Sequence, residues 1–311
     1  MLRFTVLASG SGGNASVVES ADFGLLIDAG LGPRQLSARL ADAGLTWSAI
    51  NAVLLTHTHS DHWKDRTLAY LHRRDVPLYC HPDHQRYLKA YSSGFNGLES
   101  AQLVRYFAAN QELPLAPGLR VRALPVPHDG GPTFGFRIEG PADLFGQATS
   151  LAYAADLGCW DESLVENLAD VDLLALEFNH DVVLERTSGR SALLVARVLG
   201  DEGHLSNVQA AELMRAVLAR SRPGRLQHLV QLHLSRDCND PTLARQTVEG
   251  VLRELAPQAG LHTAQQDSAG ETLHLNVEPT SRRRTPPVRR RSRSTTYVQP
   301  WLPGLEADQH V

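Results

Sequence analysis

Four metal-ligand-type side chains within six residues constrain this 311-residue chain more than any other feature. His57, His59, Asp61 and His62 follow the apolar run 51–55, which has the composition of a buried strand. Because His57 and His59 are two residues apart at the end of a strand, both imidazoles leave the backbone on the same side. Three imidazoles and one carboxylate suit zinc, manganese or iron. Two ions would share these side chains more easily than one tetrahedral ion, and a histidine-rich surface loop is the alternative.

Composition sets the limits within which this cluster must be placed. The chain is 42% hydrophobic and 21% charged, which allows one large or two small domains with a real core. Its three cysteines are odd in number and widely spaced, which favours a reducing compartment over a disulfide framework. Neither a secretory segment nor an apolar run of membrane-spanning length is evident. The sequence therefore predicts a cytoplasmic protein without membrane association.

Residues 278–311 differ from the rest of the chain in charge. Seven arginines there outnumber three acidic residues, so this tail carries +4 and residues 1–277 carry −8 of the net charge of −4. The tail is also rich in proline, serine and threonine. We predict a folded domain over 1–277 and a disordered tail over 278–311. The tail is either an arm that holds nucleic acid by counterion release or a solubilising extension with no partner.

Strand-like and helix-like segments alternate along 1–277, which predicts an α/β fold. Several strand-like runs end in polar side chains, namely Asp28, His128, Asp156, Glu177 and His233. Each has an ordinary alternative: a histidine after a strand is often incidental, and an aspartate there can cap a helix. The glycine-rich turn that ends at Asn14 is followed by strand-like residues, so it is not a nucleotide-binding P-loop. Segment 92–110 reads as a loose surface loop or a lid.

The His-x-His-x-Asp-His pattern resembles the second motif of the metallo-β-lactamase-fold hydrolases, and the resemblance extends over residues 1–277. Three further runs carry the resemblance. Ser9-Gly10-Ser11-Gly12-Gly13-Asn14 is similar to the opening signature of the YycJ-type and PhnP-type phosphodiesterase branches. Glu177-Phe178-Asn179-His180-Asp181 is similar to an element of YycJ-type proteins, and Gly203-His204-Leu205-Ser206-Asn207 resembles the Gly-His-x-Ser element of the nuclease branches. The resemblance implies an αββα sandwich. Composition alone predicts only α/β.

The resemblance also implies two metal sites that share one carboxylate. The implied ligands are His57, His59 and His128 for the first site, Asp61, His62 and His233 for the second, and Asp156 as the bridge. The implied cofactors are two divalent metal ions, zinc or manganese. Such a pair lowers the pKa of a shared water to about 7 and so supplies a hydroxide nucleophile at neutral pH. In the same comparison Asp28 is a structural acid that braces the metal loop.

Asp61 and His204 are the candidate catalytic residues. The resemblance places His204 beside the scissile phosphate. There it would stabilise charge on the phosphoryl oxygens or protonate the departing oxygen. Asn14, Asn179 and Ser206 are the candidate substrate-binding residues, although Ser206 also forms a capping box with Gln209. Glu177 and His180 are either braces for metal-bound histidines or plain loop residues.

The resemblance favours a dinuclear phosphodiesterase, and in particular a 5′–3′ exonuclease acting on DNA. About 48 positions separate Asp156 from His204, too few for the inserted domain of the β-CASP ribonucleases. A small-molecule hydrolase of cyclic phosphodiesters or thioesters and a non-catalytic metal-binding regulator are the alternatives.

Three features depart from the pattern. Asp65 stands where many relatives have glycine, Cys238 stands where YycJ-type proteins usually have asparagine, and the charge of −8 is unfavourable for DNA. The sequence leaves open the metal, the polarity of digestion and the oligomeric state.

Overall fold

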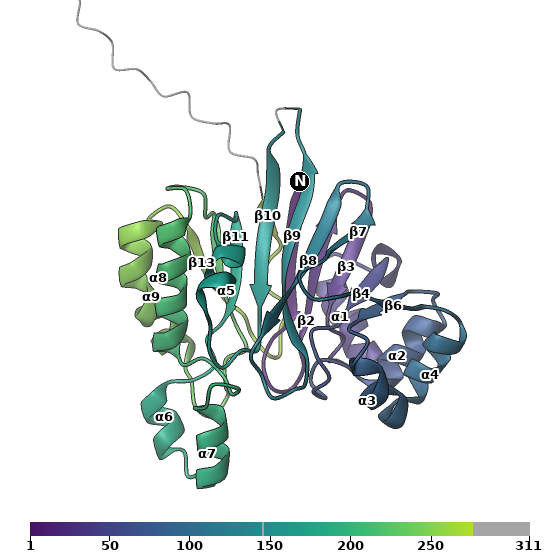
Figure 1. The fold of residues 1–311 in the computed structure, drawn as a ribbon, viewed down its shortest axis with the longest axis horizontal. Coiled ribbons are helices and arrows are strands. Elements are labelled where there is room, and N and C mark those ends of the chain that lie inside the picture. Colours follow the sequence, from purple (N-terminus) through teal and green to yellow (C-terminus); the bar gives the residue numbers. More distant parts are fainter. Residues whose placement is uncertain (145, 276–311) are drawn as a thin grey trace, which may run out of the picture. The chain divides into compact units, whose positions relative to one another are not determined.

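The computed structural model describes residues 1–144 and 146–275. Within them, two seven-stranded β-sheets pack face to face and helices cover both outer faces (Figure 1). This arrangement confirms the αββα sandwich. The predicted domain boundary after Val277 and the tail 278–311 lie outside the described residues, so both stay predictions.

The first sheet is antiparallel at one end and parallel at the other. In spatial order its strands are β14 (Leu273–Leu275), β1 (Leu2–Ala8), β2 (Ala15–Ser20), β3 (Phe23–Ile27), β4 (Ala52–Leu54), β5 (Leu78–Cys80) and β6 (Val104–Tyr106). The strands from β14 to β3 pair antiparallel, and those from β3 to β6 pair parallel. The parallel part brings the ends of β3 and β4 to the same edge.

The second sheet has the same division. In spatial order its strands are β13 (Gly260–Thr263), β12 (His228–Leu232), β11 (Leu173–Glu177), β10 (Ala148–Ala154), β9 (Thr133–Ala142), β8 (Leu119–Val126) and β7 (Glu112–Ala116). Strands β7 to β10 pair antiparallel, and β10 to β13 pair parallel. As a result β8, β10, β11 and β12 all run in one direction and end at a common edge.

The helices form the two outer layers. The first sheet is covered by α1 (Pro33–Asp42), α2 (Asp65–His72), α3 (His84–Tyr91) and α4 (Ser93–Ser100), with a 3₁₀ turn at Trp47–Ala49. The second is covered by α5 (Glu162–Leu168), α8 (Asn207–Arg220) and α9 (Pro241–Leu255). Figure 1 shows α6 (Val182–Thr187) and α7 (Ala192–Val198) projecting beyond the edge of the sheets. Within the described part, no helix is long and apolar enough to cross a membrane.

Three hydrophobic clusters correspond to the three contacts between layers. Side chains such as Phe4 and Phe136 fill the space between the sheets. Leu36 and Leu68 pack the first helical layer against its sheet, and Leu213 belongs to the cluster of the second helical layer. Many strand residues are buried on both faces, which explains why the strands read as continuous apolar runs.

Segment 92–110 is not a loose loop or a lid, because it contains α4 and β6. The hydroxyl of Ser92 accepts the backbone N–H of Phe95 and so caps the helix. Phe95 is fully buried in the cluster under the first helical layer. Gly94 lies against α2 so closely that a Cβ there would come within 2.5 Å of the Asp65 carbonyl oxygen. Tertiary packing therefore orders a stretch whose serines and glycines favour a loop.

Other helix and strand ends agree with the sequence. Ser206 and Gln209 form the predicted capping box at the start of α8. Asp240 caps α9 and Pro241 occupies its first turn. Near the end of the described residues, the alternating apolar and polar side chains of β14 are typical of a strand, and β14 pairs antiparallel with β1.

Candidate metal centre

Polar side chains gather where the strands of both sheets end. His57 follows β4, His128 follows β8, Asp156 follows β10 and His233 follows β12. The last three strands run in one direction, so their carboxyl ends deliver side chains to one edge of the second sheet. The sandwich brings the end of β4 to the same place, since His57 and Asp156 offer ligand atoms within 4.8 Å of each other.

The first group consists of His57, His59 and His128, whose ligand-type nitrogens lie within 4.8 Å of one another. The Nε2 atom of His128 is 3.2 Å from Nδ1 of His59. The His57 ring lies edge-on to the His59 ring, with centroids 4.7 Å apart. These are the three residues that the sequence assigns to the first metal site.

The second group consists of Asp61, His62 and His233, again with ligand atoms within 4.8 Å. The Oδ2 atom of Asp61 lies 3.6 Å from Nε2 of His62 and 3.5 Å from Nε2 of His233. These are the residues assigned to the second site. The described residues thus bring together both predicted sets, although coordination itself stays a proposal.

Asp156 lies between the two groups. Its Oδ2 is 3.1 Å from Nε2 of His62, and its Oδ1 is 3.4 Å from Nε2 of His233 and 4.0 Å from Nε2 of His128. The side chain is 3% exposed. One buried carboxylate therefore faces imidazoles of both groups, which is the position that a bridging ligand needs.

Hydrogen bonds on the opposite ring nitrogens fix the imidazoles in place. The Nδ1 atom of His62 lies 2.7 Å from Asp28, and that of His128 lies 2.8 Å from the carbonyl oxygen of Gly203. The Nδ1 atom of His57 lies 3.0 Å from the Thr56 hydroxyl. Each contact leaves Nε2 to face the centre. A carboxylate or carbonyl partner on the far nitrogen is the usual support of a metal-bound histidine.

One buried atom tests whether these residues fit a metal. Among the described residues, none gives the buried Nε2 of His57 a hydrogen bond. A buried imidazole nitrogen without a partner is unfavourable, unless a cation takes its lone pair. Imidazole nitrogens and carboxylate oxygens are also the donors that zinc and manganese accept. The donor set therefore fits the divalent metal binding that the fold implies.

Asp28 braces the metal loop, as the resemblance implies. Its fully buried carboxylate accepts the backbone N–H of Thr56 at 2.9 Å, in addition to the contact with His62. Nearby, Gly30 is so close to the loop that a Cβ would lie 1.7 Å from the Asp61 carbonyl oxygen. Asp28 and His233 both adopt positive φ, 61° and 55°, a strained geometry that is concentrated at functional sites.

The pKa shifts of the buried histidines and carboxylates indicate that this centre favours positive charge. Burial lowers the pKa of His57 well below its ordinary value, and the imidazole of His62 lowers it further, so His57 is neutral. Burial opposes the charge of Asp156, but His233 and His62 outweigh burial and hold the pKa of this carboxyl well below its usual range. Burial also disfavours a charged His233, yet the carboxylates led by Asp156 raise its pKa to about 10. Positive charge is thus favoured among these carboxylates.

Glu177 is a brace rather than a plain loop residue. Its fully buried carboxylate lies 2.7 Å from Nδ1 of His204 and 3.2 Å from Nδ1 of His233, and it accepts the backbone N–H groups of Leu157 and Leu205. His180 differs, because both of its ring nitrogens are buried without a partner among the described residues. Of the two positions that the sequence left open, only Glu177 contacts the histidines of the centre.

His204 is stacked on His233, with ring centroids 5.2 Å apart. Its Nδ1 is held by Glu177 and lies 3.6 Å from Asp156. Burial lowers the pKa of His204, but the carboxylate of Glu177 more than compensates, so the pKa is raised above its ordinary value. The side chain is 19% exposed. An imidazole whose protonated form is favoured by Glu177, and which is partly exposed, therefore lies beside the metal-ligand cluster.

The three candidate substrate-binding residues are all buried. The side-chain nitrogen of Asn14 lies 3.3 Å from Asp61 and 3.0 Å from Nε2 of His62. Asn179 donates to the carbonyl oxygen of His233 at 3.0 Å. Ser206 is occupied in the capping box. These contacts give each residue a structural task, and a direct contact with substrate stays a prediction.

Sequence reasoning assigned no role to Asp129, although this residue follows His128 directly. Its carboxylate lies 3.4 Å from Nε2 of His59 and forms a salt bridge with Arg197 of α7. The carboxylate thus braces His59 through the far ring nitrogen. Proximity to His128 was the available signal, but the partner Arg197 is 68 positions away in sequence.

Residues 24–222 match the family described as Beta-lactamase superfamily domain. The chain is 30% identical over 261 residues to exodeoxyribonuclease YycJ of Bacillus anthracis, and the matched region covers 81% of this chain and 90% of that protein. It is 28% identical over 272 residues to exodeoxyribonuclease WalJ of Streptococcus pneumoniae, with coverage of 87% and 95%. Among solved structures, the metallo-β-lactamase fold protein YhfI of Bacillus subtilis has a TM-score of 0.60 at 17% identity, covering 86% of this chain and 98% of YhfI. The chain therefore belongs to the metallo-β-lactamase superfamily of hydrolases, in the group of the YycJ- and WalJ-type proteins.

Proposed function

We propose that this hydrolase is a dinuclear phosphodiesterase that digests DNA as a 5′–3′ exonuclease. The position of His204 carries the proposal: its partly exposed imidazole, held by Glu177 and with a raised pKa, lies beside a cluster of side chains that suit divalent cations. A phosphodiester carries a negative charge through the whole reaction, so a fixed cation beside the reacting group is useful at every stage. Two relatives that match over most of their length are named exodeoxyribonucleases, and they support this choice of substrate.

We assign the metal ligands as two groups joined by Asp156, with zinc or manganese as the ions. His57, His59 and His128 would hold the first ion, and Asp61, His62 and His233 the second. When bound, such ions act as Lewis acids and lower the pKa of water to about 7. The side chains of Asp28, Glu177 and Asp129 keep the imidazoles in their orientations.

The chain's own proton chemistry is assigned to His204. Glu177 holds Nδ1, and among the described residues no hydrogen bond engages Nε2. A proton on Nε2 can therefore be donated to a phosphoryl oxygen or to the departing oxygen of the ester. Asp61 is the second candidate, because its carboxylate is 19% exposed whereas that of Asp156 is 3% exposed, so Asp61 lies nearer to an arriving substrate.

The cellular setting stays a proposal as well. We infer a cytoplasmic enzyme whose partner is a DNA end, and we assign the arginine-rich residues 278–311 as an additional contact with nucleic acid. Their contribution would be electrostatic and independent of sequence, and so sensitive to salt.

The test uses the full chain loaded with Mn²⁺ or Zn²⁺ and one single-stranded DNA labelled at either the 5′ or the 3′ end. A 5′–3′ exonuclease releases the 5′ label as a mononucleotide at once, whereas the 3′-labelled strand shortens gradually. The His204→Ala variant should cleave roughly 10²–10⁴-fold more slowly with an unchanged metal content.

Three outcomes would contradict the proposal. Immediate release of the 3′ label would reverse the polarity. Intact DNA together with turnover of a cyclic phosphodiester or a thioester would make the protein a small-molecule hydrolase. Stoichiometric metal binding without hydrolysis of any ester would leave a metal-binding regulator.

A further inference from the structure

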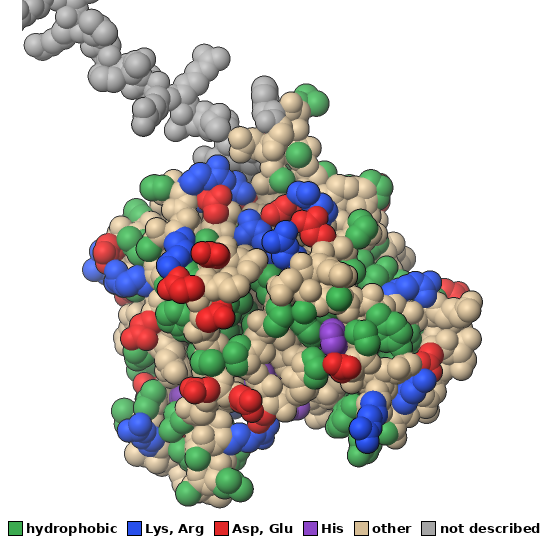
Figure 2. Space-filling model, viewed as in Figure 1, with side chains coloured by type: hydrophobic (Ala, Val, Ile, Leu, Met, Phe, Trp, Pro, Cys, Tyr) green, Lys and Arg blue, Asp and Glu red, His purple; other side chains and the backbone are tan. Residues whose placement is uncertain are grey.

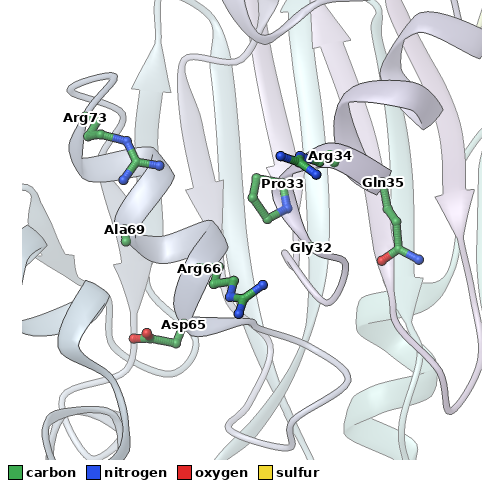
Figure 3. Close-up of a pocket in the computed structure, with 8 residues that line it drawn as sticks. All are labelled: Gly32, Pro33, Arg34, Gln35, Asp65, Arg66, Ala69 and Arg73. Atoms are coloured by element: carbon green, nitrogen blue, oxygen red, sulfur yellow. The ribbon is translucent and has the colours of Figure 1, made fainter.

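A groove of about 500 Å³ lies between the start of α1 and the length of α2. Its lining residues are Gly32, Pro33, Arg34, Gln35, Asp65, Arg66, Ala69 and Arg73. Figure 3 shows the guanidinium groups of Arg34, Arg66 and Arg73 turned toward the space between the two helices. All three side chains are exposed. The small side chain of Ala69 lies between Arg66 of α2 and Arg73, which directly follows this helix, and leaves that space open.

The arginines of this groove differ from most others in having no carboxylate partner. The face shown in Figure 2 mixes acidic and basic side chains. Elsewhere in the protein many arginines are paired, as in the salt bridges Arg122–Glu112 and Arg222–Asp170. Within residues 1–144 and 146–275, no salt bridge involves Arg34, Arg66 or Arg73.

The acid that lines the groove does not neutralise it. The carboxylate of Asp65 accepts the hydroxyl of Ser92 at 2.7 Å and the backbone N–H of Gly94 at 2.8 Å, both at the start of α4. Asp65 therefore serves the neighbouring helix. Figure 3 shows its carboxylate on the far side of α2 from Arg34.

The groove begins beside the metal loop. Gly30 donates its N–H to the carbonyl oxygen of Asn14, and the Asn14 N–H in turn donates to the carbonyl oxygen of Asp61. Asp65 is three residues beyond His62, so its Cα lies at most about 11 Å from that of a proposed ligand. The distance from the metal centre to the start of the groove is therefore no more than a few nucleotides of an extended strand.

We propose that this groove binds the backbone phosphates of the single DNA strand whose end occupies the metal centre. Arg66 lies in α2 and Arg73 is the C-cap of this helix with helical dihedral angles, so the two residues are about 10 Å apart along its axis. Two arginines at this spacing can contact different phosphates of one strand, and each contact would release counterions. Arg34 faces them from the opposite wall, and planar guanidinium groups suit bidentate phosphate contacts.

This inference rests on the proposed function, and it adds a contact outside the metal centre. The experiment is fluorescence anisotropy with a 20-nucleotide single strand whose linkages are all phosphorothioates, which slow cleavage during the titration. The full, metal-loaded chain is compared with the double variant Arg34→Gln/Arg66→Gln between 50 and 200 mM salt. Arg253→Gln, which removes an exposed arginine from α9, is the control.

Loss of two phosphate contacts should reduce the slope of log K against log salt by about 1.4 and raise Kd roughly tenfold or more. Arg253→Gln should match the wild type. Metal content and melting temperature, measured in parallel, show that the variant keeps its centre and its fold. A double variant with these properties intact but an unchanged slope would overturn the groove assignment.

Two further results separate this inference from others. If the wild type neither binds nor digests DNA, the proposed function fails and the groove assignment fails with it. If the wild type digests DNA and the double variant loses affinity equally for the strand and for deoxyadenosine monophosphate, the groove holds a lone phosphate. That result would also overturn the assignment to a strand.

Discussion

Acid should destabilise this protein through His84, a histidine at the start of α3 outside the metal centre. His84 is fully buried, and its ring makes two hydrogen bonds. Nε2 donates to the carbonyl oxygen of Pro132 at 2.6 Å, and Nδ1 accepts the backbone N–H of His81 at 3.3 Å. This pair of bonds requires the neutral ring with its proton on Nε2. A second proton, on Nδ1, would break the bond from His81.

Burial lowers the pKa of His84 from 6.5 to about 4. Below pH 6.5 the unfolded chain binds a proton at this position, whereas the folded protein resists protonation until about pH 4. The contribution of His84 to stability is therefore complete above pH 6.5 and falls as the pH is lowered toward 4. At pH 5 the solution is roughly 1.5 pH units below the pKa of the unfolded chain and still above that of the folded protein, which corresponds to a loss of about 2 kcal/mol in the free energy of unfolding.

The assay is urea unfolding of the wild type and His84→Gln at pH 7.5 and pH 5.0. Each protein is compared with itself, so the cost of the substitution at neutral pH cancels. The wild type should lose about 2 kcal/mol more than the variant between the two pH values. His274→Gln, which removes an exposed imidazole, is the matched control. An equal loss in the wild type and His84→Gln would refute the reasoning.

Three substitutions test the packing around the metal loop and α4. Asp28→Asn would place an amide N–H₂ against Nδ1 of His62 and move the proton of that ring to Nε2. Metal affinity, measured by competition with a chelator, should therefore fall about 10–100-fold. An unchanged Kd for the metal would contradict the bracing role of Asp28. Gly30→Ala forces the Asp61 backbone to move and should also weaken metal binding. A titration that gives the wild-type metal affinity would contradict this expectation. Gly94→Ala should lower the free energy of unfolding by about 1–3 kcal/mol in urea, because a Cβ meets the backbone of α2. Gly250→Ala in α9 is its control, since no atom lies within 4 Å of the added Cβ and stability should rise by up to about 1 kcal/mol; equal effects of the two changes would refute the packing argument.

The candidate centre was largely predictable because its residues follow strands. A buried apolar run that ends in a histidine or an aspartate places a ligand at a sheet edge, and His57, His128, Asp156 and His233 all follow this rule. Their assignment to sites nevertheless came from the family resemblance. Spacing along the chain did not reveal which strand ends would meet.

Contacts between residues far apart in the chain could not be predicted from the sequence. Glu177 could be a brace or a loop residue, and the choice depends on His204, 27 positions away. The helix α4 was read as a loop because its serines and glycines have weak helix propensity. The burial of Phe95 and the close approach of Gly94 to α2 provide the missing stabilisation, and both arise only in the assembled fold.

The charge of −8 on residues 1–277 does not weigh against a DNA substrate once the charges are located. Carboxylates such as Asp28, Asp61, Asp156 and Glu177 lie within the metal centre, where two divalent ions would add +4. Roughly half of the net negative charge would thus be neutralised at the place where the scissile phosphate must bind. The arginines between α1 and α2, which form no salt bridge within the described residues, lie outside that centre. If DNA is the substrate, as proposed, it would meet cations at its reacting end and beside it, although the sum over the whole domain is negative.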